Sequence, residues 1–323
     1  MPRSDSTAVS KTAEDSDGFE AIIGSGSSGS GGAAQRLKII SIVILLLGLC
    51  TIAFPFALQY KTALEQADQV GKSAGRVAGW PYPQAKEALE AARDYNRHLA
   101  VSGQPVMGEA VDPFTAKSQR TEGSAAAADR EYQSALDQGD GIMGSIEIPR
   151  ISVNLPIYHG TSEAALASGA GHLYGTSLPV GGPSTHSVIT GHRGMVDALM
   201  FTRLDELEPG DVFYIRTMGE TLGYKVDRID VIRPDDTSKL KIMAGQDRVT
   251  LMTCTPYGVN TRRLLISGFR APMPEPVPYP QDAKKDTRSV MAVTIFLTLV
   301  ALLLTAMRRP RLAVMRHSSG KRV

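Results

Sequence analysis

One cysteine, four histidines and two adjacent arginines are the residues of this chain whose types could carry out acyl transfer. Cys254 ends the strand-like run 248–253, and Arg262 and Arg263 lead the next apolar run, 264–266. A thiol held as thiolate by a nearby base is a candidate nucleophile, and an arginine suits oxyanion stabilisation because its guanidinium stays charged. The competing interpretation is that Cys254 is a small buried hydrophobic residue, as most cysteines outside disulfides are.

A partner for the thiol must come from the histidines of the central region. His192 has the most suggestive setting, because it follows the strand-like run 187–190 through Gly191, and a side chain at such a corner can face a cleft. A histidine that only makes structural hydrogen bonds is the commoner case, so the residues alone leave the choice open. The candidates are His159, His172, His186 and His192.

Strand alternation separates the two arginines without choosing between them. If the runs around Cys254 and Arg263 pair as a hairpin, Arg262 and Arg263 point to opposite faces, and one of them shares the face of the thiol. The other cysteine, Cys50, lies in an uncharged hydrophobic segment, so we expect no disulfide between the two cysteines.

Two uncharged runs near the ends of the chain predict membrane spans. Ile39–Leu58 has twenty residues and 289–307 has nineteen, and at about 1.5 Å per residue each crosses a hydrocarbon core of about 30 Å. Six Lys and Arg residues and no acidic residue follow the second run. By the positive-inside rule we expect a multi-pass protein of the cell membrane, with both termini cytoplasmic and residues 59–288 outside the cytoplasm.

Composition narrows the range of partners. The formal net charge is +2 and no basic stripe marks the central region, which argues against a nucleic-acid partner. No spacing of metal ligands is visible, and we expect no metal or other cofactor. The polar residues 1–36, with a Gly/Ser run at 24–32, predict a disordered tail.

The central region changes character along its length. Apolar residues at helical spacing predict a helix over 83–101, and a shorter one is expected over 125–136. From Gly141 onward, short runs rich in Val, Ile and Tyr alternate with Gly and Pro, which predicts an all-β barrel or sandwich preceded by helices. The expected strands are 145–148, 151–158, 187–190, 212–217, 222–232, 249–253 and 264–269.

The tripeptide Asp112-Pro113-Phe114 lies between the two predicted helices. Asp-Pro commonly opens a turn, so these residues alone predict only a turn.

Several motifs resemble those of sortases, the membrane-bound cysteine transpeptidases of Gram-positive bacteria. Thr250–Cys254 followed by Arg263 resembles the sortase signature, and Thr190–Gly194 resembles the segment that carries the sortase histidine. The order His, Cys, Arg agrees with the family, and the match favours Arg263 over Arg262. The runs 254–265 and 175–182, and a span at each end, resemble class C, the pilin-polymerising subgroup, although that subgroup often has His at position 262.

This resemblance implies a mainly β fold, a closed sortase-type β-barrel with short helices, an N-terminal helical segment and two transmembrane helices. It implies His192, Cys254 and Arg263 as catalytic residues. Asp112, Pro113 and Phe114 would form a lid, with the acid on the arginine and the ring over the thiol. The implied reaction cleaves an LPxTG-like sorting signal between Thr and Gly and joins pilins through lysine isopeptide bonds.

The expected division of the chain follows from the spans, the helices and the extent of the resemblance. It is a disordered cytoplasmic tail at 1–36, a transmembrane helix at 37–58, a helical segment with the lid loop at 59–140, the catalytic barrel at 141–272, a linker at 273–288, a transmembrane helix at 289–307 and a basic cytoplasmic tail at 308–323.

Three alternatives remain beside a pilin polymerase. A housekeeping sortase would anchor surface proteins to cell-wall peptide, but the Asp-Pro-Phe motif and the second span argue against it. An L,D-transpeptidase should show a Ser-His-Gly-Cys-like block, and the sequence has none. A pilin-binding membrane scaffold without catalysis would not need the cysteine, histidine and arginine together.

Overall fold

The computed structural model describes residues 30–105, 107, 125–272 and 287–307. Met1–Phe54 and Pro55–Val323 form two compact units. Helix α2 (Ser30–Ala78) begins within the predicted tail 1–36 and continues twenty residues beyond the first predicted span. Its stretch Gln35–Ala78 is the one helix, among the described residues, that is long and apolar enough to cross a membrane. A second helix, α7 (Thr287–Met307), forms over the other uncharged run.

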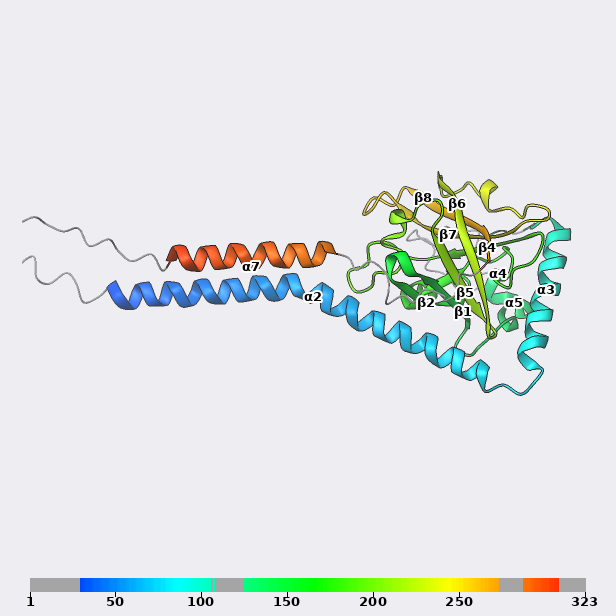
Figure 1. Cartoon of the computed structure of the whole chain (residues 1–323), viewed down its shortest axis with the longest axis horizontal. Helices are drawn as coiled ribbons and strands as arrows, with labels where there is room; N and C mark the ends of the chain where they lie inside the picture. Colours follow the sequence, from blue (N-terminus) through cyan, green and yellow to red (C-terminus); the bar gives the residue numbers. More distant parts are fainter. Residues whose placement is uncertain (1–29, 106, 108–124, 273–286, 308–323) are drawn as a thin grey trace, which may run out of the picture. The chain divides into compact units, whose positions relative to one another are not determined.

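The expected barrel is present and closed. Its strands are β1 (Ile142–Ile148), β2 (Val153–His159), β3 (Ala170–His172), β4 (Thr185–Thr190), β5 (Val212–Thr217), β6 (Glu220–Ile232), β7 (Asp247–Thr255) and β8 (Arg262–Arg270). Around the barrel the order is β1-β2-β3-β4-β7-β8-β6-β5. Figure 1 labels all of these strands except β3. Closure leaves no sheet edge along this ring. The alternating pattern predicted a barrel or a sandwich, and the resemblance implied the closed barrel that is found.

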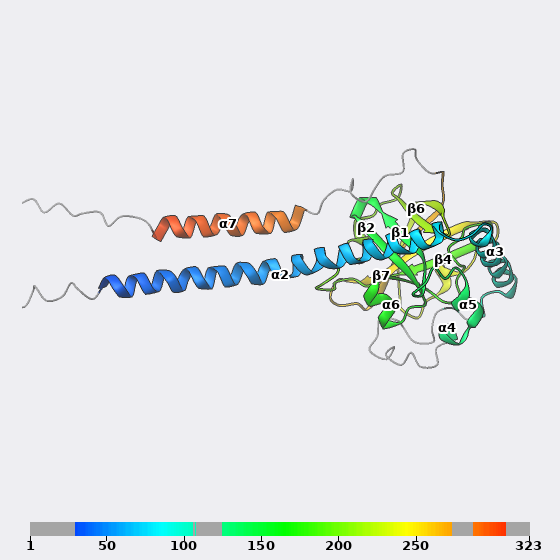
Figure 2. The same cartoon turned by 90° about the horizontal axis from the view of Figure 1, so that it is seen from below.

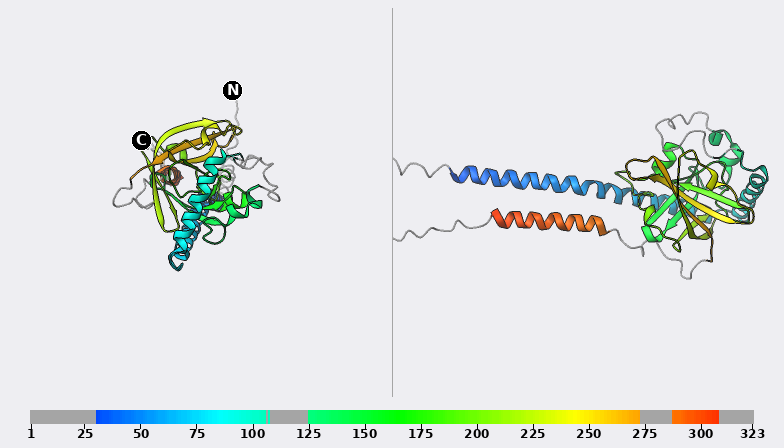
Figure 3. Two further views of the ribbon diagram at one scale, coloured as in Figure 1. Left: turned by 90° about the vertical axis from the view of Figure 1, so that its right-hand side faces the viewer. Right: turned by 90° about the horizontal axis from the view of Figure 1, so that it is seen from above.

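Strand β7 is the one on which the site depends. It pairs with β4 in parallel, with Thr190 opposite Met252, and with β8 in antiparallel, with Leu251 opposite Ile266. The pair β2 and β3 is also parallel. Figure 3 shows the barrel strands from two further directions. The corner after β4 and the end of β7 therefore lie side by side, although the chain runs through β5 and β6 between them.

Alternation divides the side chains of β7 between two apolar clusters. Val249 and Leu251 belong to the main core, together with Ile189 of β4 and Ile266 of β8. Met252 belongs to a second, smaller cluster with five other apolar residues, Leu173, Val188, Ile232, Leu240 and Leu265. Because successive side chains of a strand point to opposite faces, this second cluster lies on the outer face of the barrel.

Helix α3 and several short helices complete the fold. They are α3 (Gln84–Ser102), α4 (Ala125–Ala128), α5 (Arg130–Ser134), α6 (Glu163–Ser168), and the 3-10 turns η2 (Pro149–Ile151), η3 (Leu204–Glu206) and η4 (Ser238–Leu240). Helices α3, α4 and α5 gather on one side of the barrel (Figure 2). Buried Asn96 fixes α3 there, because its side chain donates to Leu178 O at 2.9 Å and accepts from Leu178 N at 2.7 Å.

The predicted helix over 125–136 is in fact two short helices. Asp129 separates them with extended backbone, and its carboxylate accepts a hydrogen bond from Tyr132 N at 2.9 Å as the N-cap of α5. This break places the fully buried Tyr132 ring against the barrel, where its hydroxyl lies 2.9 Å from His172 Nδ1. Helix α6 and strand β3 form where the sequence predicted no element.

Candidate active site

Cys254 and Arg263 lie directly opposite each other on neighbouring strands. Their Cα atoms are paired in the antiparallel ladder of β7 and β8, one residue from the end of each strand. Both residues are 3% exposed. Directly opposed residues of an antiparallel pair point to the same side of the sheet, so the thiol and the guanidinium share one face.

That face is the outer one. Two residues before Cys254 is Met252, and two residues after Arg263 is Leu265, and both belong to the outer apolar cluster. Since side chains two apart on a strand share a face, the thiol and the guanidinium continue this cluster at one end of the barrel. The candidate site therefore lies at the end of a buried apolar cluster, with a nucleophile and a cation as its last members.

The structure distinguishes the two arginines that the sequence left open. Arg262 is exposed, whereas Arg263 is buried. The Nη1 group of Arg263 donates to the backbone oxygens of Asn260, at 3.2 Å, and Arg262, at 3.1 Å. These bonds orient the guanidinium from the loop side, which is the arrangement expected of a preorganised cation.

His192 is placed beside β7 by the backbone before it. Gly191 N donates to Met252 O at 3.1 Å, and the buried hydroxyl of Thr253 donates to Gly191 O at 2.8 Å. On the other side, His192 O accepts from Phe201 N at 3.0 Å. His192 thus follows a residue that is tied to the two residues before the cysteine, so the thiol and the imidazole belong to one end of the barrel.

The protonation of His192 is set by two opposing influences. Burial lowers the pKa of its half-buried imidazole below the ordinary value, and the negative charge of Glu163 in α6 opposes that shift. A neutral imidazole can accept a proton and return it during acyl transfer.

The other three candidate histidines have structural roles. Both ring nitrogens of His159 lie within 3.0 Å of backbone oxygens. His172 is fully buried between the Tyr132 hydroxyl and Ser177 O, and burial lowers its pKa to about 4. His186 lies between Lys241 O and the Thr250 hydroxyl.

Arg193 is a residue whose importance the sequence did not reveal. Its side chain is only 8% exposed, it forms an ion pair with Asp205 at 2.6 Å, and it lies over the Tyr257 ring with 5.8 Å to the centroid. Its Nη1 also reaches the Thr255 hydroxyl at 3.5 Å. Arg193 therefore connects the loop after His192 to the loop after Cys254. The one feature of the sequence that could have pointed to Arg193 is its position next to His192.

The predicted lid residues Asp112, Pro113 and Phe114 lie outside the described residues. Met107, five residues before Asp112, is described and packs against the outer apolar cluster next to the site. Groups of three or more metal-ligating side chains are not found among the residues that the structure describes.

Comparison with known proteins gives a consistent result. Residues 146–271 match the family described as Sortase domain. The chain is 32% identical to sortase D of Bacillus subtilis (strain 168) over 130 residues, which are 39% of this chain and 63% of that protein. It is 24% identical to sortase A of Bacillus anthracis over 178 residues, or 49% and 83% of the two chains. The chain thus spans somewhat less than two thirds of the Bacillus subtilis relative.

Solved structures match a larger share of the chain than the family does. Sortase C-1 of Streptococcus pneumoniae superposes with a TM-score of 0.56 at 40% identity, over 64% of this chain and 100% of that one. Sortase C-1 of Actinomyces oris gives a TM-score of 0.52 at 47% identity, over 59% and 99% of the two chains.

Proposed function

The chain belongs to the sortases, a family of cysteine transpeptidases, and to their class C, and from this membership we propose that it joins pilin subunits by acyl transfer. Its substrates would be pilins with an LPxTG-like sorting signal and an acceptor lysine. The observation that carries the proposal is the register that sets Cys254 opposite Arg263, beside the corner of His192. A solved relative, sortase C of Streptococcus pneumoniae, is described in terms of pilin substrate specificity.

In the first step, His192 takes the proton of the Cys254 thiol, and the thiolate attacks the carbonyl carbon of the Thr–Gly bond in the sorting signal. The oxyanion that forms is stabilised by the Arg263 guanidinium. The carbon–nitrogen bond then breaks as His192 gives a proton to the departing glycine amine, which leaves a thioester on Cys254.

In the second step, the lysine amine of another pilin attacks the thioester. His192 takes a proton from this amine, the thiolate leaves, and an isopeptide bond joins the two subunits. Water is the competing nucleophile. The low exposure of Cys254 and Arg263 supports a guarded site.

Membrane attachment completes the proposal. The apolar part of α2 supports one anchor. We propose that α7 is a second span and that both termini are cytoplasmic, with the barrel outside, because the six basic residues after Met307 favour the cytoplasmic side. Proteolysis of intact and of opened cells tests this topology: cleavage within the barrel only in opened cells would contradict it.

The lid also remains a proposal, because Asp112, Pro113 and Phe114 lie outside the described residues. In it, the Asp112 carboxylate pairs with Arg263 and the Phe114 ring covers Cys254 until substrate binds. Met107 precedes these residues in the chain and packs on the outer apolar cluster next to Cys254 and Arg263. This position supports the proposal.

The decisive experiment is mass spectrometry of the full chain after incubation with pilin tails that carry the sorting signal. We expect an added mass on Cys254 equal to the tail up to its Thr, released by hydroxylamine. Cys50→Ala should leave the adduct unchanged and Cys254→Ala should abolish it. Joining of pilins by Cys254→Ala would refute the proposal. Loss of all anchored surface proteins on gene deletion, rather than of pili alone, would favour a housekeeping sortase.

A further inference from the structure

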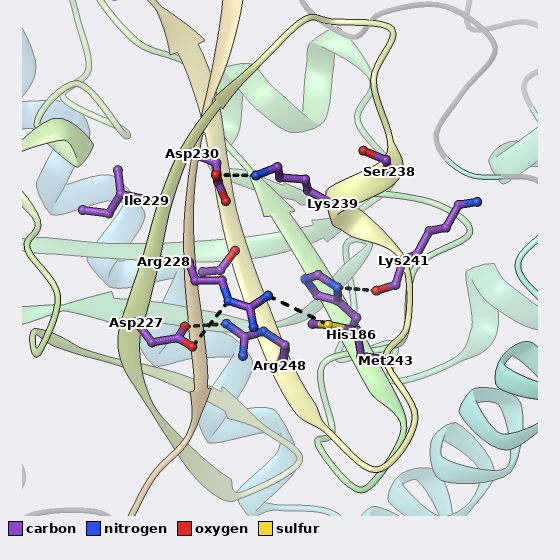
Figure 4. A pocket seen from close by; sticks show the side chains of 11 residues that line it. His186, Asp227, Arg228, Ile229, Asp230, Ser238, Lys239, Lys241, Met243 and Arg248 are labelled. Carbon is purple, nitrogen blue, oxygen red and sulfur yellow. Dashed lines mark hydrogen bonds and ion pairs between the residues drawn. The ribbon is translucent and has the colours of Figure 1, made fainter.

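A polar cleft of about 630 Å³ opens on the outer face of the barrel, away from the catalytic residues (Figure 4). It is lined by residues of β4, β6, β7 and β8 and of the connection 238–243. The Thr250 hydroxyl beneath it lies 2.7 Å from both His186 Nε2 and Ser267 Oγ, so three strands are hydrogen-bonded there. The cleft is therefore a fixed part of the barrel wall.

The cleft has an excess of positive charge. Its lining includes four Lys or Arg residues and two Asp residues. The Asp227 carboxylate pairs with both Arg248 and Arg228, as Figure 4 shows. Lys239 pairs with Asp230 at 2.5 Å.

The charge of the cleft at pH 7 depends on Lys241 and His186. Within the part of the chain that the structure describes, the exposed ammonium of Lys241 has no ion-pair partner. The pKa of His186 is lowered to about 4, mainly by burial and also by the charges of Arg248 and Arg228, against a hydrogen bond to Lys241 O that raises it. His186 is therefore neutral at pH 7, and the positive charge of the cleft comes from its Lys and Arg residues.

The cleft and the thiol lie along the same strand. Arg248 and Cys254 are six residues apart on β7 and so point to the same face. At about 3.3 Å per residue, they are separated by about 20 Å. Between them on that face lie Thr250 and Met252 and, on β8, Leu265, and all three side chains are buried.

We propose that this cleft binds acidic side chains in the two or three residues that precede the Leu of the sorting signal. The inference rests on the proposed function. An extended peptide advances about 3.3–3.6 Å per residue, so about 20 Å reaches about six residues back from the Thr on Cys254. The x, Pro and Leu positions take up the first three. On a peptide that runs along β7 from Cys254, the residues before the Leu are therefore the ones that reach the cleft.

The test compares peptides that differ only in the residues before the motif, Asp-Asp, Ala-Ala or Lys-Lys. Binding is measured on the full-length Cys254→Ala protein in detergent at low ionic strength, so that it does not depend on catalysis. We expect the Asp-Asp peptide to bind about fivefold more tightly than Ala-Ala, the upper range of exposed ion pairs, and this preference to fade in high salt.

Lys241→Glu and Arg228→Glu should each remove or reverse the preference, since both side chains are exposed and can be replaced without opening the core. The matched control is Lys225→Glu, an exposed lysine of β6 outside the cleft, which should keep the preference. Equal binding of the three peptides would overturn the inference. The inference would also be overturned if the protein showed no preference among the peptides but bound anionic lipid vesicles, and if Lys241→Glu abolished that vesicle binding. Cleavage by the Cys254-containing protein tests the proposed function separately.

Discussion

A methyl group at position 191 should disturb the site more than its size suggests. A Cβ atom added to Gly191 would lie 2.8 Å from Cδ2 and 2.9 Å from Cγ of Phe201. The Phe201 ring is fully buried in the main core. Ordinary contact begins at 3.4 Å, so the backbone or the ring must move by about 0.6 Å, and a close-packed core resists this.

Two measurable effects follow for Gly191→Ala. Overpacking should lower the free energy of unfolding by about 1–3 kcal/mol, which is about 2–10 °C in unfolding temperature for a domain of this size. Since His192 is the next residue, its imidazole should also shift. A misplacement of about 1 Å can cost about 100-fold in rate, so we expect kcat/KM for sorting-signal cleavage to fall about 10- to 100-fold.

The assays are thermal unfolding and peptide cleavage on the full chain in detergent. Gly75→Ala in α2 is the matched control, because a Cβ there meets nothing within 4 Å and replacing a helical glycine should stabilise the helix by up to about 1 kcal/mol. An unchanged unfolding temperature in Gly191→Ala would refute the packing argument. Lowered stability with full activity would show that the position of His192 does not limit the rate.

Three further predictions concern the surroundings of the site. Glu163→Gln should lower the pKa of His192 further, because the carboxylate that opposes the effect of burial is lost; an NMR titration of the imidazole measures it. Arg193→Ala should reduce kcat/KM about tenfold with a smaller effect on unfolding temperature, because the link between the two active-site loops is broken. Asp112→Ala should speed alkylation of Cys254 several-fold, as followed with a thiol-reactive probe.

Each of these predictions can fail clearly. A pKa of His192 that does not respond to Glu163→Gln, or that responds equally in high salt, would contradict an electrostatic cause. Full activity in Arg193→Ala would show that the two loops hold their places independently. An unchanged alkylation rate in Asp112→Ala would count against the lid.

The local pattern of the sequence was enough to predict seven of the eight strands, but it left a barrel and a sandwich open, because closure depends on which strands pair. It missed strand β3, which has only three residues. It also joined α4 to α5, because alanine-rich spacing outweighed the capping role of Asp129. Tertiary contact decides both: β3 is held by its neighbours, and the break at Asp129 lets Tyr132 enter the core.

For the candidate site, sequence reasoning found the residue types but not their arrangement. Alternation separated Arg262 from Arg263, and only the register of β7 against β8 sets Arg263 opposite Cys254. The resemblance selected His192, whereas its position depends on the contact of Gly191 with Thr253. The cleft around Lys241 had no sequence signal, because its charged residues are spread over β6, the connection 238–243 and β7.

The parallel pairing of β4 with β7 also has a consequence for folding. The hydrogen bond that joins Thr253 to Gly191 closes a separation of 62 residues. Contacts between residues so far apart in the sequence form slowly, because the intervening chain must lose conformational entropy before the contacts contribute any stabilisation. A chain synthesised as far as β6 holds His192 but neither Cys254 nor Arg263. The protein should therefore remain inactive until its last two strands insert between β4 and β6, so that completion of the barrel and the onset of catalysis are one event.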